Sequence, residues 1–430
     1  MTRIVPTDVK NAGIPSKPGT RTTRRNAREF FAKYFLEGQN LNNSLKTEHE
    51  IQGVALPFHE RYRKYIAFVL PFLFFQICWW SLAIRYDLFR LYPARYEMAI
   101  TMVFGALVGG ATSEGGGAVA FPVMTLLLNV PPIVARDFSL MIQSTGMAAS
   151  SFTILWMRVK LEWSSIIFSG LGAAVSIILG LQFFDNILTP QQKKMMFVSI
   201  WFAFAMSLLI LNLQRKRVTY HRIPQFNWWK AVLLFVTGMF GGILTAFTGS
   251  GVDICSFSML TLLFRVRNYS VDLYLENNLT FSLVSEKVAT PTSIILMWMN
   301  SWVGFYWRQL IMTDISVLAW EYFAVSVPVV VLVSPVGAFI SSHLHRQVLA
   351  AFVYALETIA VIGFLITGPP LKLIAAGAVI IVIGSLFFYA VSYVGARLSD
   401  SIETTKGNSN DIIIRPTIQS NVSSAVDLKV

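Results

Sequence analysis

Residues 109–122 read GGATSEGGGAVAFP and decide the fold of this chain. The stretch lies within a long apolar region, yet it places three consecutive glycines directly after Glu114. Glycine weakens the interior of a helix, and a charge near the centre of a membrane helix costs about 2.5–3.5 kcal/mol. A continuous membrane helix would therefore avoid this sequence, and we expect a turn of the backbone here instead.

The composition indicates a protein that crosses a lipid bilayer several times. Of the 430 residues, 54% are hydrophobic and 13% are charged, and the mean hydropathy is +0.57. Soluble domains contain about 25% charged residues. Several apolar runs approach the roughly 20 residues that cross a bilayer as a helix, at 66–84, 164–184, 195–213 and 348–367. We therefore predict an all-α polytopic membrane protein.

The net charge of +12 does not indicate a nucleic-acid partner in such a chain. Lys and Arg collect in the cytoplasmic tails and loops of membrane proteins, and here they are frequent before residue 65 and between 214 and 230. Cys78 and Cys255 lie in separate apolar segments and give neither a metal-binding spacing nor a disulfide framework. The sequence thus implies no cofactor and no metal site.

The glycine-rich stretch recurs in the second half of the chain. GSG at 249–251 follows GGG at 115–117 with an offset of 134 residues, and each triplet stands between two apolar segments. The fourteen or so residues before each triplet would form a helix of about 21 Å, at 1.5 Å per residue. Such a helix passes the middle of the bilayer without crossing it. We therefore expect each half to enter the membrane, turn at the glycines and return on the same side.

The distribution of basic residues supports two re-entrant hairpins of this kind. They place the loop 214–227, with Arg215, Lys216, Arg217 and Arg222, in the cytoplasm, where positive residues are preferred. About eight full crossings then remain, and both termini are cytoplasmic. Each repeat has an odd number of crossings, so the second repeat is inverted. Inverted repeats with broken helices that meet near the middle of the bilayer are typical of secondary transporters.

This interpretation divides the chain into seven segments. A basic cytoplasmic tail occupies 1–64, and an extra first transmembrane helix with its loop occupies 65–95. The repeats occupy 96–213 and 228–367, and the basic cytoplasmic loop 214–227 separates them. A last transmembrane helix at 368–397 and a flexible tail at 398–430 follow.

The two turns would form a binding site for a small anion. Glycine permits a tight turn and lets a ligand approach the backbone, and the free N–H groups that start a helix attract anions. Polar side chains at helical spacing follow each turn and would add further donors. We expect the substrate to contact Gly115, Gly116, Gly117, Gly249, Ser250, Gly251, Ser139, Gln143, Ser144, Asn277 and Asn278, with Lys287 as a countercharge.

Glu114 and Asp253 flank the two turns and allow two interpretations. A carboxyl group there would bind a coupling proton or cation, because an ionised carboxylate repels an anion. Alternatively, it would cap the short helix that follows the turn. Two further glycine pairs have the four-residue spacing of close helix packing, and we expect them to serve that purpose: Gly105/Gly109 and Gly238/Gly242.

Residues 105–122, GALVGGATSEGGGAVAFP, resemble the sulfite exporter TauE/SafE family of membrane permeases. The likeness covers about 66–396 and rests on Gly109, the triplet 115–117 and Pro122, with a weaker element, GGILTAFTGSGVD, in the second half. The resemblance implies transport of small, often sulfur-containing anions, such as sulfite, sulfonates or related organic acids. The second half departs from the pattern, because Ser250 replaces the middle glycine and Asp253 follows the triplet.

Two other functions fit the same residues. A passive anion channel would use the exposed amide groups of the turns as a selectivity element. An intramembrane serine hydrolase would use Ser250 as its nucleophile, but such a mechanism needs a base, usually His, within hydrogen-bond reach. All 5 histidines lie outside the apolar spans. We therefore expect a transporter rather than an enzyme.

Overall fold

The computed structural model describes residues 61–112, 114–185, 187–213, 226–264, 288–341 and 346–413. Across these ranges the chain forms 12 α-helices and no strand, which confirms the all-α prediction. The helices are α4 Arg63–Tyr86, α5 Tyr92–Ala111, α6 Gly117–Pro122, α7 Pro132–Trp156, α8 Trp163–Leu179, α9 Pro190–Leu213, α10 Trp228–Thr248, α11 Val252–Ser258, α12 Ala289–Tyr306, α13 Val317–Ser341, α14 Arg346–Ile366 and α15 Leu371–Ile413.

Short segments of other helical geometry connect or extend these helices. A 3-10 turn, η2 (Leu88–Leu91), joins α4 to α5. Each of α6, α8, α11 and α12 continues directly into a π-helical segment. These segments are η3 Val123–Leu127, η4 Gly180–Phe184, η5 Met259–Leu263 and η6 Trp307–Met312.

Five of the described helices are long and apolar enough to cross a bilayer, by length and composition. They are Arg63–Tyr86, Trp163–Phe184, Trp228–Thr248, Val317–Ile340 and Leu371–Gly395. Three shorter apolar helices accompany them, at Gly117–Leu127, Val252–Leu263 and Ala350–Ile366. Large apolar side chains such as Ile77 of α4 and Leu386 of α15 are exposed, as contact with lipid requires.

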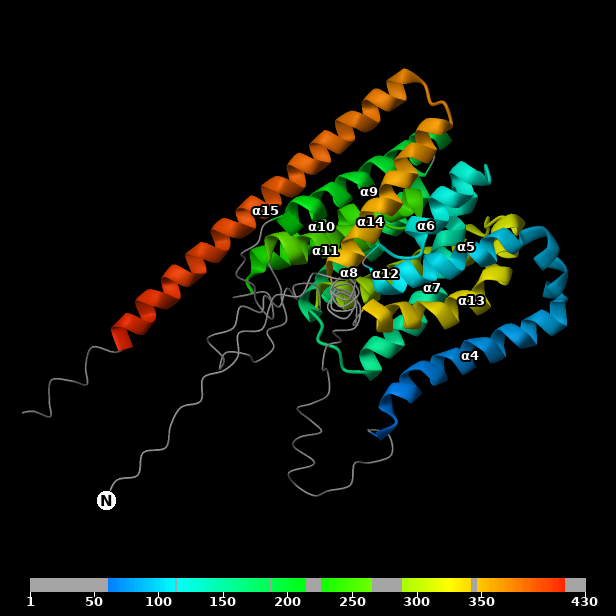
Figure 1. Ribbon diagram of the computed structural model, residues 1–430, viewed down its shortest axis with the longest axis horizontal. Coiled ribbons are helices and arrows are strands. Elements are labelled where there is room, and N and C mark those ends of the chain that lie inside the picture. The colour runs from blue at the N-terminus through cyan, green and yellow to red at the C-terminus, as the bar shows by residue number, and fades with distance from the viewer. Residues whose placement is uncertain are drawn as a thin grey trace, which may run out of the picture.

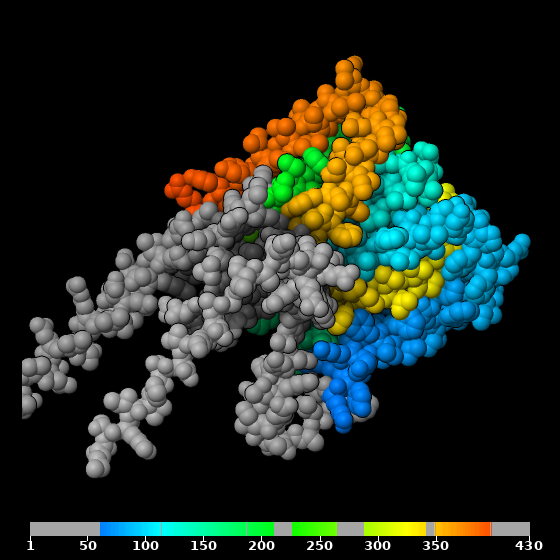
Figure 2. All heavy atoms as spheres, in the orientation of Figure 1, coloured from blue at the N-terminus to red at the C-terminus, as the bar shows by residue number. Residues whose placement is uncertain are grey.

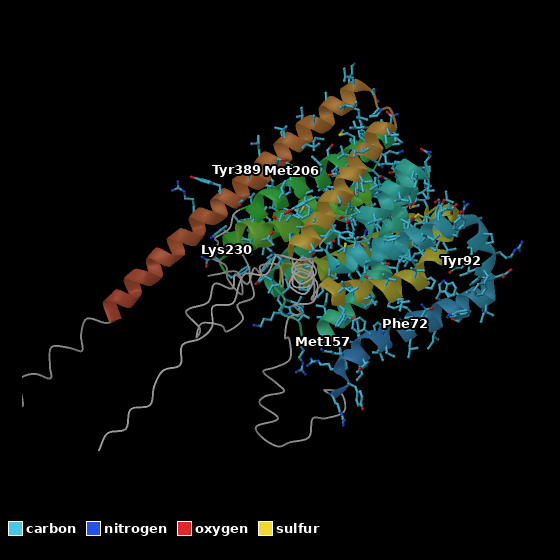
Figure 3. The ribbon with its side chains drawn as sticks, viewed as in Figure 1. Phe72, Tyr92, Met157, Met206, Lys230 and Tyr389 are labelled. Atoms are coloured by element: carbon cyan, nitrogen blue, oxygen red, sulfur yellow. The ribbon has the colours of Figure 1, made fainter. Side chains whose placement is uncertain are left out.

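The outermost helices lie on opposite sides of the molecule. Figure 1 shows α4 and α15 at opposite edges with the remaining helices between them, and the space-filling view in Figure 2 shows the same order. α15 packs along α9, where the ring centroids of Phe388 and Phe204 lie 6.2 Å apart. Figure 3 labels one residue on each helix, Tyr389 on α15 and Met206 on α9. α4 packs on α13 and α7, where Arg63 donates hydrogen bonds to the carbonyl oxygen of Trp156.

α15 extends further than the sequence predicted. It remains helical to Ile413, whereas the last crossing was expected to end at 397 and a flexible tail to begin at 398. Each residue added to an existing helix forms one more backbone hydrogen bond, and this polar extension contains no proline to stop it.

α6 folds back along α5, and α11 folds back along α10. A Cβ atom added at Gly109 would lie 2.4 Å from the backbone nitrogen of Gly116, so the turn rests directly on the preceding helix. In the second half, a Cβ atom at Gly241 would lie 2.6 Å from the Cα atom of Val252. The chain therefore reverses direction at both glycine-containing turns.

The helices that lead into the turns are longer than expected. α5 has 20 residues and α10 has 21, instead of about fourteen, so each is about 30 Å long at 1.5 Å per residue. Pro93 in the first turn of α5 starts that helix earlier, because proline suits the first helical positions. Helix length therefore does not prevent either helix from crossing, and the reversal of the chain depends on the packing of the turns.

The contacts of the first half have counterparts in the second half. α5 packs most extensively on α13, and α10 packs most extensively on α8. α7 and α12 pack against each other, and they also contact α6 and α11, respectively. α7 also packs on α13, and in the same way α12 packs on α8. This pattern matches α5, α6, α7 and α8 with α10, α11, α12 and α13.

The two glycine pairs with four-residue spacing serve close packing, as predicted. A Cβ atom at Gly238 would lie 2.0 Å from the carbonyl oxygen of Ser169, and one at Gly242 would lie 2.1 Å from the hydroxyl oxygen of Ser176, both on α8. Gly109 packs on Gly116 within its own hairpin, and the carbonyl oxygen of Gly105 lies 3.3 Å from a Cβ atom at Gly116.

Candidate anion site between two turns

Each turn needs glycine at its first position. Gly115 has a φ of 73° and Gly249 a φ of 84°, in the left-handed region that other residues rarely adopt. α10 ends directly before Gly249 and α5 ends at Ala111, shortly before Gly115, so the chain reverses where the sequence places glycine.

Threonine hydroxyl groups satisfy the backbone of both turns. The Thr112 hydroxyl accepts a hydrogen bond of 3.2 Å from the backbone nitrogen of Glu114. The Thr245 hydroxyl accepts one of 3.3 Å from Val252, and the Thr248 hydroxyl donates one of 2.8 Å to the carbonyl oxygen of Ser250. Irregular backbone inside a membrane protein requires such internal partners.

The two turns touch each other, although they lie far apart in the sequence. The Ser250 hydroxyl donates to Asp253 Oδ2 at 2.8 Å, and it lies 3.4 Å from the carbonyl oxygen of Glu114 in the other turn. A Cβ atom at Gly117 would lie 3.4 Å from the Cβ atom of Ser250, and one at Gly115 would lie 3.6 Å from Asp253 Oδ2. All these residues are buried.

α7 and α12 supply the polar walls of this contact. The Gln143 Nε2 atom lies 2.0 Å from the position of a Cβ atom at Gly117. The Cβ atom of Ser139, one turn earlier on α7, lies 2.6 Å from the corresponding position at Gly249. From α12, Ser301 donates a hydrogen bond of 3.2 Å to Gln143 Oε1.

Several buried polar atoms at this contact have no hydrogen-bond partner. They are Gln143 Nε2, Ser139 Oγ, Asp253 Oδ1 and both carboxyl oxygens of Glu114. About nine in ten buried polar groups are hydrogen-bonded in native proteins. Unpaired donors and acceptors that gather at one buried point therefore mark a place for a polar ligand.

The structure brings six of the twelve predicted substrate-binding residues together. Gly115, Gly117 and Ser250 form the contact between the turns, Gln143 faces Gly117, and Gly249 packs on Ser139. Gly116 and Gly251 lie in the turns but pack back onto their own hairpins, against Gly105 and Leu244. The Ser144 hydroxyl donates a 2.6 Å hydrogen bond to the carbonyl oxygen of Met141 on its own helix. Ser144 is therefore not the free donor that the sequence predicted. Asn277, Asn278 and Lys287 lie outside the described residues.

The family described as "Sulfite exporter TauE/SafE" matches residues 98–364, which contain both turns, α7 and α12. The chain belongs to this family. TauE/SafE proteins are membrane transporters and not enzymes, so the chain is an integral multi-pass membrane transporter and the serine hydrolase alternative is wrong. No curated protein and no solved structure matches the chain.

Three buried polar residues of this TauE/SafE chain were not predicted for the site. Asn300 and Ser301 lie on α12, and neither amide atom of Asn300 has a partner. Met297, three residues before Asn300, packs on Gly115, so this face of α12 is directed toward the first turn. Glu357 of α14 is fully buried and unpaired. The adjacent polar pair Asn300–Ser301 within an apolar run was the available sequence signal.

A buried network of ion pairs lies beside the second turn. Arg308 of η6 pairs with Asp137 of α7 at 2.7 Å, and Arg136 pairs with Asp185 at 2.6 Å. Arg136 also donates a hydrogen bond of 3.3 Å to the carbonyl oxygen of Ala246, near the end of α10. This network links α7, α10 and η6 and ties the base of the second turn to α7.

Acidic and basic groups neutralise each other in this network. Arg308 also pairs with Asp314 at 2.6 Å, and Lys193 of α9 pairs with Asp185. Burial alone would raise the pKa of Asp185, but the charges of Arg136 and Lys193 outweigh burial and lower that pKa below its ordinary value. The basic side chains are therefore already paired, and the network holds helices together rather than offering an open anion site.

Neither carboxyl group beside the turns forms a helix cap. α6 begins after Gly116 and α11 after Gly251, and no side chain makes a capping hydrogen bond at either start. Neither oxygen of the Glu114 carboxyl group has a hydrogen-bond partner, whereas Asp253, in the first turn of α11, accepts the hydrogen bond from Ser250. Among the described residues, no group of three or more His, Cys, Asp and Glu is arranged to hold a metal ion.

Proposed function

We propose that this TauE/SafE chain is a secondary transporter of a small oxyanion, such as sulfite, a sulfonate or a related organic acid. The anion would bind where the two glycine turns touch, and alternating access would expose that point to each side of the membrane in turn. The observation that carries the proposal is the buried contact between Gly117 and Ser250, surrounded by unpaired polar atoms.

The arrangement of helices supports inverted repeats around this site. In this interpretation α5–α9 form the first repeat and α10–α14 the second, with α4 and α15 as the extra helices. The pairs α5–α6 and α10–α11 are re-entrant hairpins. Eight full crossings remain, namely α4, α7, α8, α9, α12, α13, α14 and α15, and both termini are cytoplasmic.

Neutral donors would recognise the anion in this site. Gln143 Nε2 and Ser139 Oγ are buried donors without acceptors, and the glycine turns let a ligand approach the backbone closely. An oxyanion offers several acceptors within a small volume, so one ligand satisfies donors from both α7 and the turns. Glu114 and Asp253 are the candidates for binding a coupling ion.

Burial of the site supports alternating access over a passive channel. Glu114 and Asp253 are 0% exposed, and Gln143 and Ser250 are 1% exposed. A channel needs a continuous path through its selectivity element, whereas a transporter passes through states in which the site is closed. A passive anion channel stays the second candidate because its filter could use the same amide groups.

Transport by purified protein in liposomes tests the proposed function. Vesicles containing an unlabelled anion are diluted into its ³⁵S-labelled form, using sulfite, isethionate, methanesulfonate and sulfoacetate in turn. We expect the label of at least one anion to accumulate transiently above its equilibrium level. The Gln143→Leu variant should not show this accumulation. Gln182→Leu, at an exposed glutamine, is the matched control. Simple equilibration without overshoot would support a channel, and absence of flux with all four would refute the proposal.

A further inference from the structure

Three fully buried carboxyl groups gather around the two turns. Glu114 lies in the first turn, Asp253 begins α11, and Glu357 lies on α14, and each is 0% exposed. α14 packs on α6 and η3, which follow the first turn, and Glu357 interacts electrostatically with Glu114. Both oxygens of Glu114, both oxygens of Glu357 and one oxygen of Asp253 lack a hydrogen-bond partner.

Basic side chains near these carboxyl groups are already engaged elsewhere. On α9, which packs on α14, Lys193 pairs with Asp185 and Lys194 donates to the carbonyl oxygen of Thr125. On α5, Arg95 pairs with Glu321 of α13 at 2.9 Å. Within the described part of the chain, no ion pair therefore neutralises the three carboxyl groups.

The other charged groups on neighbouring elements are also accounted for. Arg136 and Asp137 of α7 and Arg308 after α12 belong to the ion-pair network described above. Glu97 of α5 and Lys230 of α10 lie near the N-terminal ends of their helices, at the opposite end from the turns. The thiol of Cys255 is the other titratable group on α11 beside Asp253. An ionised carboxylate at full burial without a partner is strongly unfavourable, so these carboxyl groups need a positive ligand.

A second observation points to an anion at the same place. The Gln143 amide donor is unpaired, 1% exposed, and directed at Gly117, whose Cβ position lies 3.4 Å from the Cβ atom of Ser250. Ser250 in turn donates to Asp253. An unpaired donor for an anion therefore lies at the same buried contact as Asp253, one of whose oxygens is unpaired, and Glu114, both of whose oxygens are.

We infer that Glu114, Asp253 and Glu357 take up protons when the anion binds, so that the anion and protons cross the membrane in the same direction. The inference rests on the anion site proposed above. An ionised carboxylate beside the site would repel the anion, whereas a protonated one would not. Binding of the anion and binding of protons therefore strengthen each other, and this coupling is reciprocal.

Protons suit this cluster better than a metal ion. Among the described residues, no group of three or more acidic, histidine or cysteine side chains could hold a metal ion. Each carboxyl group can take a proton singly, without further ligands. The cluster therefore couples anion movement to proton movement instead of forming a cation cage.

Simultaneous measurement of anion and proton flux tests the inference. Vesicles that contain the purified protein and an internal pH-sensitive dye receive an inward gradient of ³⁵S-isethionate, with the membrane potential clamped at zero. A sulfonate stays ionised throughout the assay, so any proton movement comes through the protein. We expect acidification of the interior together with isethionate entry. Entry without acidification would overturn the inference and leave the proposed function intact, whereas absence of entry would overturn both for this substrate class.

Equilibrium binding in detergent gives a second readout that does not need transport. The dissociation constant for isethionate should rise with pH, by about tenfold per pH unit for each linked proton. Glu357→Gln mimics the protonated side chain and should reduce that slope. Glu321→Gln, at the Arg95 ion pair, is the matched control and should keep it. A wild-type constant that does not change with pH would overturn the inference, and an unchanged slope in Glu357→Gln would exclude that residue from the cluster.

Discussion

Replacing Gly117 by alanine tests whether the Gln143 amide binds the substrate. The new Cβ atom would lie 2.0 Å from Gln143 Nε2 and 3.4 Å from the Cβ atom of Ser250. Non-bonded heavy atoms sit about 3.5 Å apart, so the amide must move by about 1.5 Å. Because Nε2 is the far end of a flexible side chain, the amide can move while the backbone of the turn stays in place.

The expected effect falls on transport rather than on folding. A hydrogen bond to a charged partner contributes about 1.5–3 kcal/mol, so its loss should raise KM by about 10- to 150-fold. Moving the side chain off its preferred rotamer costs about 0.5–1.5 kcal/mol, and alanine regains about 1 kcal/mol over glycine in a helix. The free energy of unfolding should therefore change by less than about 1 kcal/mol.

Two glycine variants serve as controls for Gly117→Ala. Gly170→Ala would place its Cβ atom 3.4 Å from Leu296, an ordinary contact, and should leave KM unchanged. Gly109→Ala would meet the backbone nitrogen of Gly116 at 2.4 Å and should disrupt the turn and lower the melting temperature. KM is measured in proteoliposomes and stability by tryptophan fluorescence on heating. A KM within about twofold of wild type, in a normally folded Gly117→Ala protein, would refute the role of the amide.

Three further predictions concern stability and are checked by thermal unfolding in detergent. Arg308→Met removes a partner of buried Asp137 and should cost about 3 kcal/mol, while restoration by Arg308→Lys should be incomplete because lysine lacks the forked geometry. Gly238→Ala would bring a Cβ atom to 2.0 Å from the carbonyl oxygen of Ser169, so it should separate α8 from α10 and cost about 1–3 kcal/mol. Because the pKa of Asp185 is lower in the folded protein, Asp185 stabilises the fold at pH values above its pKa in the unfolded chain. Acidification that protonates Asp185 should remove this contribution, and the Asp185→Asn variant should not show that loss.

The turns could be predicted from the sequence because their cause is local. Gly115 and Gly249 adopt backbone angles that strongly favour glycine, and the apolar segments around them leave few alternatives. Ser139 and Gln143 could also be placed, because helical spacing from a nearby turn fixes which residues share a face. The local sequence was sufficient to predict those site residues that lie close to a turn along the chain.

The second polar wall could not be derived from a fixed offset. The offset of 134 residues aligns Ser144 with Asn278, but α12, which packs on α7, begins only at Ala289. η3 ends at Leu127 and α7 begins at Pro132, whereas η5 ends at Leu263 and α12 begins at Ala289, so equal spacing fails beyond the hairpins. Asn300 and Ser301 therefore occupy the side of the site that faces α7.

The ion-pair network was missed for a different reason. Arg136 and Asp137 lie in the first turns of a helix, and Asp185 lies in a connection, where charges are usually exposed to water. Only the packing of α9 and η6 around them buries these groups. Such burial depends on contacts between distant segments, which single-sequence patterns do not reveal.

The direct backbone contact of α10 with α8, and of α5 with α13, has a consequence for how the molecule can move. A Cβ atom at Gly172 would lie 2.1 Å from the carbonyl oxygen of Phe235, and one at Gly337 would lie 2.5 Å from that of Leu107. Helices this close have no room to rotate or slide independently of each other. Pairs of spectroscopic labels on α8 and α10, or on α5 and α13, should therefore keep a constant separation throughout transport.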